Sequence, residues 1–88
     1  MEEHSWVTYE NTNAAARKRV EAGTILVNLT LNQVENKQYN LMIEAGIESV
    51  SVTLHSINLE KAMEEADGFA REYFLDRAKL LEEIAQRI

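Results

Sequence analysis

The chain has 88 residues, of which 45% are hydrophobic and 27% are charged, a balance typical of one small globular domain rather than a disordered chain. Nine Lys and Arg stand against fifteen Asp and Glu, so the formal net charge of −6 disfavours nonspecific binding to nucleic acid or to an anionic membrane. The absence of cysteine excludes disulfides, thiolate metal sites and thiol catalysis.

The first quarter of the chain is expected to form two short elements. Residues 6–9 combine aromatic and β-branched side chains and fit a short strand at the edge of a sheet. Residues 13–22 are predicted to form a short helix, with Thr12 or Asn13 as N-cap and Gly23 as the left-handed residue after the last turn. Because its apolar side chains are mostly alanine, this helix is expected to depend on docking to the rest of the domain.

Three runs of strict alternation follow, at residues 24–32, 37–45 and 49–55, and each is typical of a strand with one buried face. The apolar side chains expected on that face are Ile25, Val27, Leu29, Leu31, Tyr39, Leu41, Ile43, Ala45, Val50, Val52 and Leu54. The connectors between the runs are short, so neighbouring strands are predicted to pair antiparallel as a meander. Such a sheet needs an apolar cover on one side.

Residues 58–88 supply this cover as a predicted amphipathic helix that begins at an N-cap, Asn58. Side chains of its first half that fall within about 60° of one direction are expected to face the sheet: Leu59, Ala62, Met63, Ala66, Phe69, Ala70 and Tyr73. The length of this first half matches that of the predicted strands.

The apolar stripe changes direction in the second half of the helix. A new stripe, rotated by about 80° from the first, contains Phe74, Ala78, Leu81, Ala85 and Ile88, with Ile84 at its margin. Three interpretations are open: packing on the N-terminal segment of the same chain, contact with a second copy or another protein, or fraying of the helix end. A homodimer through Phe74, Leu81, Ile84 and Ile88 is therefore one hypothesis.

The predicted fold class is α+β. A three-stranded antiparallel meander, four-stranded if residues 6–9 add an edge strand, has one face covered by a long C-terminal helix, and a short N-terminal helix precedes it. The chain is predicted to be a single domain, residues 1–88, made of an N-terminal segment 1–23, a β-meander 24–57 and the helix 58–88.

No pattern in the chain predicts a catalytic, cofactor-binding or metal site, so we expect a protein that is not an enzyme. His55 lies on a predicted strand, but no spacing supplies the orienting carboxylate and nucleophile that a general base needs. The carboxylates of the helix diverge, whereas metal ligation requires them to converge. Asp67 with Arg71, and Glu83 with Arg87, instead have the i to i+4 spacing of helix ion pairs.

Two surfaces are candidates for binding a protein partner. The first is the acidic side of the helix, with Glu60, Glu64, Glu65, Asp67, Glu82 and Glu83. The second is the outer face of the sheet, which is rich in hydrogen-bonding groups and nearly free of charge, with Asn28, Thr30, Asn40, Met42, Thr53 and His55. The basic run at residues 17–19 is expected to pair with the chain's own acidic groups rather than with nucleic acid.

The acidic start of the chain lacks the basic and apolar pattern of a signal peptide. Its apolar stretches are also far shorter than the roughly 20 residues that span a bilayer. We therefore expect a cytoplasmic protein that does not bind membranes.

These features favour a small interaction protein that inhibits a larger nucleic-acid-handling enzyme or complex. The acidic helix would enter a basic groove that normally receives nucleic acid and would block it sterically or electrostatically. In length and acidity the chain resembles phage-encoded antagonists such as anti-CRISPR proteins. A structural homodimer without an inhibitory role is a further hypothesis.

A second hypothesis rests on the order of residues 39–44, the third strand and residues 58–66. This order is similar to HicB-type antitoxins, in which a strand meander is followed by a helix opening with a Leu-Glu-Glu-Ala-like segment. The resemblance covers residues 38–74 and implies neutralisation of a toxin by protein contact. The chain departs from the family where a Pro-Gly-Cys turn is usual, and no DNA-binding module follows the helix.

Overall fold

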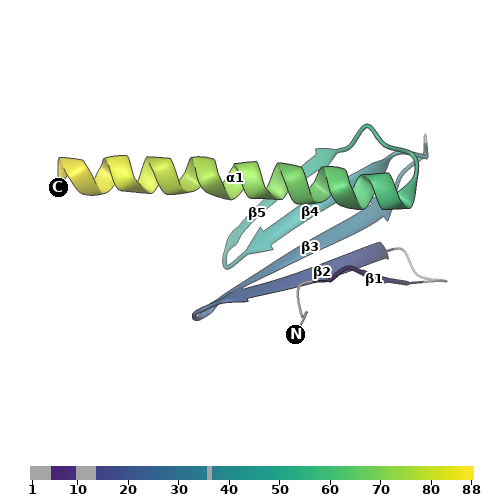
Figure 1. Ribbon diagram of the computed structural model, residues 1–88, viewed down its shortest axis with the longest axis horizontal. Helices are drawn as coiled ribbons and strands as arrows, with labels where there is room; N and C mark the ends of the chain where they lie inside the picture. Colours follow the sequence, from purple (N-terminus) through teal and green to yellow (C-terminus); the bar gives the residue numbers. More distant parts are fainter. Residues whose placement is uncertain (1–4, 10–13, 36) are drawn as a thin grey trace.

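The computed structural model describes residues 5–9, 14–35 and 37–88 and has an α+β architecture (Figure 1). Five antiparallel strands lie side by side in chain order: β1 (Val7–Thr8), β2 (Ala14–Ala22), β3 (Ile25–Gln33), β4 (Tyr39–Ala45) and β5 (Glu48–Thr53). One long helix, α1 (Leu59–Arg87), follows and lies across one face of the sheet. The predicted meander with a C-terminal helix is confirmed, and the sheet has five strands rather than three or four.

The predicted N-terminal helix is wrong, because residues 14–22 form strand β2. This strand pairs with β3 in a register that places Val20 opposite Val27. A helix of this composition would bury little more than alanine, whereas the strand gains a full backbone ladder and puts Val20 on the apolar face of the sheet. The N-cap proposed at residues 12–13 lies outside the described residues.

Gly23 adopts the positive φ that the sequence predicted for it, but in a different role. Its φ of 64° lies in the two-residue turn that joins β2 to β3, not after a helix. Gly46, with φ 66°, occupies the equivalent place between β4 and β5. Both turns use glycine because a side chain is strained in this backbone conformation.

The core lies between the inner face of the sheet and α1. Its largest fully buried side chains are Leu31, Leu41, Ile43 and Leu54. Three alanines of α1, spaced four residues apart, are buried against them: Ala62, Ala66 and Ala70. Small side chains at this spacing form one ridge along the helix and allow it to approach the sheet closely.

The helix is longer than the sheet that it covers. Its 29 residues correspond to about 43 Å, whereas the nine residues of β3 correspond to about 30 Å. Every residue from Ala78 to Ile88 is exposed, and Figure 1 shows this end of α1 projecting past the sheet. Within the described part of the N-terminal segment, Trp6 contacts the first half of α1, at Asp67, rather than the projecting end.

Replacement of the core residue Leu41 by alanine is expected to lower the free energy of unfolding by about 2 to 4 kcal/mol, because it leaves a cavity beneath the helix. Leu75→Ala is the matched control, since Leu75 is 57% exposed on α1 and should change the free energy by less than about 1 kcal/mol. Urea unfolding followed by circular dichroism measures both. Equal losses in the two variants would contradict the described core.

Candidate functional site

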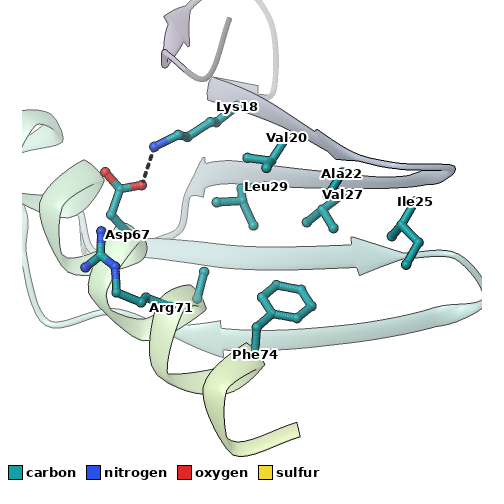
Figure 2. Close-up of a pocket in the computed structure, with 10 residues that line it drawn as sticks. Lys18, Val20, Ala22, Ile25, Val27, Leu29, Asp67, Arg71 and Phe74 are labelled. Atoms are coloured by element: carbon teal, nitrogen blue, oxygen red, sulfur yellow. Dashed lines mark hydrogen bonds and ion pairs between the residues drawn. The ribbon is translucent and has the colours of Figure 1, made fainter. Parts of the chain in front are cut away.

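An apolar groove of about 510 Å³ lies between α1 and the β2–β3 hairpin. Figure 2 shows the side chain of Phe74 directed from the helix toward the hairpin. The apolar wall is formed by Val20, Ala22, Ile25, Val27, Leu29, Ala70 and Phe74, and the polar end by Lys18, Asp67 and Arg71. The groove is thus built for apolar contact along its length, with charge at one end only.

The tip of the β2–β3 hairpin lies beyond the reach of the helix. Ile25, the first residue of β3, points to the inner face and is still 60% exposed. Val27, two residues further along the strand, is half-buried. The inner face of the hairpin is therefore covered toward its middle and open at its tip, which makes the tip a candidate for a binding surface.

At the polar end of the groove, Asp67 joins three elements. Its Oδ1 accepts hydrogen bonds from Trp6 Nε1 at 3.1 Å and from Lys18 Nζ at 2.9 Å, and Lys18 Nζ also lies 5.7 Å from the centre of the Trp6 ring. Both partners of this ion pair are partly buried. The predicted pairing of the basic run with the chain's own acids is therefore observed for Lys18, and Asp67 is engaged within the chain.

Arg71 has no hydrogen-bond or ion-pair partner among the described residues, although its spacing from Asp67 suggested one. Asp67 pairs with Lys18 instead, since the strand brings this ammonium to the groove side of the helix. The second predicted helix pair is confirmed, with Arg87 Nη2 lying 3.3 Å from Glu83 Oε2. Arg71 therefore stands at the groove edge as a charge available to a partner.

Glu65 holds the loop that leads from β5 into α1. Its carboxylate accepts hydrogen bonds from the backbone N–H groups of His55 and Ser56 and from the Ser56 hydroxyl, at 2.9 to 3.2 Å. Burial alone would raise the pKa of Glu65, but these donors outweigh burial and lower the pKa below its ordinary value of 4.5. Glu65 is thus also engaged within the chain.

Of the acidic residues expected to bind a partner, Glu60 and Glu64 are exposed on the outward side of α1. Glu82 and Glu83 are exposed on its projecting end, Glu83 in the pair with Arg87. Glu72, which the sequence analysis did not include, is exposed between these two groups. The acidic surface therefore runs along the solvent side of the helix.

Of the residues predicted on the outer face of the sheet, all but His55 share that face. The register places Thr30 beside Met42 and Asn40 beside Thr53, and Asn28 lies on the same face as Thr30 because it is two residues away on β3. His55 is exposed in the loop after β5 rather than on a strand.

This outer face also carries two positive charges that were not foreseen. Arg17 lies opposite Thr30 and Arg19 lies opposite Asn28. They were missed because residues 13–22 were expected to be helical. The face is therefore less neutral than the sequence suggested.

The groove residues Val20 and Ala22 were missed for the same reason. A signal was present, since residues 19–22 alternate charged and apolar side chains before a two-residue Gly23–Thr24 linker. Alternation that ends at such a linker, with another alternating run directly after it, is typical of a hairpin.

Comparisons with protein-family models, curated proteins and solved structures found no match to this chain. Among the described residues, no three His, Asp or Glu side chains are arranged to hold a metal ion. The helix that the structure describes is not apolar enough over its length to cross a membrane. The geometry of the surfaces is thus the basis for the functional argument.

Glu65→Gln is expected to reduce the pH dependence of stability on the acid side. Because folding lowers the pKa of Glu65, the ionised carboxylate stabilises the folded state. This stabilisation is fully present above pH 4.5 and is lost as the pH falls through the lower pKa of Glu65 in the folded state. Urea unfolding at pH 6 and at pH 3 should therefore show a smaller loss of stability on acidification in the variant than in the wild type. Glu64→Gln, an exposed neighbour on the same helix, should retain the wild-type loss.

Proposed function

We propose that this chain is a small protein-binding module that inhibits a larger nucleic-acid-handling enzyme. The outward side of α1 would lie against the basic groove of that enzyme and exclude the nucleic acid. The observation that carries the proposal is the set of exposed carboxylates of Glu60, Glu64 and Glu72, which have no partner among the described residues.

The net negative charge of α1 supports the placement of its outward side against a basic groove. The helix carries eight Asp and Glu against five Lys and Arg, a net charge of −3. Two of its cations are already paired within the chain, Arg77 with Glu48 and Arg87 with Glu83. A surface of this sign accelerates association with a basic partner and competes with phosphate groups for the same cations.

The lining of the groove favours binding over catalysis. Its walls are aliphatic and aromatic, and Lys18 and Asp67 at its polar end are bonded to each other. A pair bonded in this way holds the fold together and offers neither a general base nor a nucleophile to a substrate.

The proposal is tested by capture of the target on immobilised protein from a lysate of the natural host. Glu60, Glu64 and Glu72 are changed together to Gln, and the matched control changes the exposed residues Glu21, Glu35 and Glu44 to Gln. Both variants move the formal charge from −6 to −3. The helix variant should lose about tenfold or more in affinity for the target, while the control should lose much less.

The captured protein should act on nucleic acid, should be inhibited by the wild-type chain, and should be released by duplex DNA and by salt. Equal losses in the two triple variants would contradict the role of the helix. A captured protein that DNA does not displace would contradict the groove-blocking mode.

A further inference from the structure

We propose that a second copy of this chain occupies the apolar groove, and that it does so with the projecting end of its own helix. The inserted surface is the distal stripe, defined here as Phe74, Ala78, Leu81, Ala85 and Ile88. Each copy would donate its distal stripe and accept that of the other. The proposal concerns the protein alone and is independent of the inhibitory function.

The accessible surface of the single chain is larger than that of a compact monomer of the same mass. The accessible area is 6639 Å² for 10.1 kDa, whereas a folded monomer of this mass exposes about 5,300 Å². The radius of gyration is 14.3 Å, against about 12 Å for a compact chain of this length. Part of this excess comes from the projecting end of α1, where every residue from Ala78 to Ile88 is exposed.

The groove and the distal stripe form one continuous apolar surface. At 100° per residue, the stripe lies on the same side of α1 as Ala70 and Phe74, which line the groove. Beyond Phe74 that side of the helix has no sheet opposite it, and Leu81 is 56% exposed. The acceptor and the donor surfaces are therefore adjacent on the same helix, as a two-fold contact requires.

A two-fold axis across this surface makes the two helices antiparallel. With Phe74 of one copy opposite Leu81 of the other, the axis passes beside Ala78. The alanine side chain is small, so the two helices can approach each other closely at the centre. Leu81 of the second copy then lies over the open apolar wall near Val27, which the first copy leaves half-buried.

The charges beside the stripe are complementary in this arrangement. Arg71 and Glu82 are eleven residues apart, which on a helix is three turns and places them within about 20° of each other. Both residues therefore lie along the same edge of the stripe. When two helices pair antiparallel about a two-fold axis, this edge of one helix lies against the same edge of the other. Arg71 of each copy faces Glu82 of the other, and neither residue has a partner among the described residues of its own chain.

The first test is the mass of the purified protein by light scattering and sedimentation. The wild type is expected to have twice the 10.1 kDa of one chain. Leu81→Glu should raise the dimer dissociation constant about a hundredfold or more, because it buries a carboxylate in each half of the interface. Leu75→Glu is the control, since Leu75 is 57% and Leu81 56% exposed but Leu75 points away from the groove.

The second test is a charge reversal that keeps the apolar surface intact. Arg71→Glu should raise the dissociation constant about tenfold, because both symmetry-related pairs become repulsive. The double variant Arg71→Glu with Glu82→Arg should restore the wild-type value. A wild-type monomer at about 200 μM, equal effects of the two leucine variants, or no recovery in the double variant would each overturn the proposal.

Discussion

One helix about 10 Å wide covers a sheet whose five strands are spaced about 4.8 Å apart, and this mismatch in width governs the rest of the structure. The helix packs chiefly over β4, so the tip of the β2–β3 hairpin is left uncovered. The same helix is longer than any strand, so its end from Ala78 onward is left uncovered as well. The width of the helix therefore leaves the groove open, and its length leaves the projecting end exposed.

Two polar anchors fix the helix over the sheet. Glu65 holds the loop after β5 through backbone N–H groups. Asp67 holds β2 through Lys18 and the residue before β1 through Trp6. Residues two apart on a helix point about 200° away from each other, so these carboxylates hold α1 from opposite sides. Part of the acidity that marks the helix in the sequence therefore serves its position rather than a partner.

Much of this fold can be predicted from the sequence, wherever a residue pattern is compatible with only one type of secondary structure. Alternation over seven to nine residues identified β3, β4 and β5, and Asn58 was recognised as the helix N-cap, where its Oδ1 accepts from the Lys61 N–H at 3.1 Å. Strand β2 was missed because its alanines suit a helix, and because a glycine with positive φ is required both after a helix and within a hairpin turn. The helical period predicts on which side of α1 Glu65 and Asp67 lie. It does not predict the hydrogen-bond donors that these two carboxylates meet there.

The groove could not be predicted from the sequence either. One of its walls contains Val20, which lines the groove only because residues 14–22 form a strand, and its open side depends on where the helix packs on the sheet. The direction of the distal stripe was visible in the sequence, but the surface that would receive it was not. With β2 in place, the groove lies beside the distal stripe, and in the proposed dimer each copy covers the groove of the other.

Isotope-filtered NMR on a mixture of ¹³C-labelled and unlabelled protein tests this pairing most directly, because it detects only contacts between different copies. We expect intermolecular contacts between the methyl groups of Leu81 and those of Val20 and Val27. Their absence at a concentration where the protein is dimeric, or contacts confined to the outer face of the sheet, would contradict it.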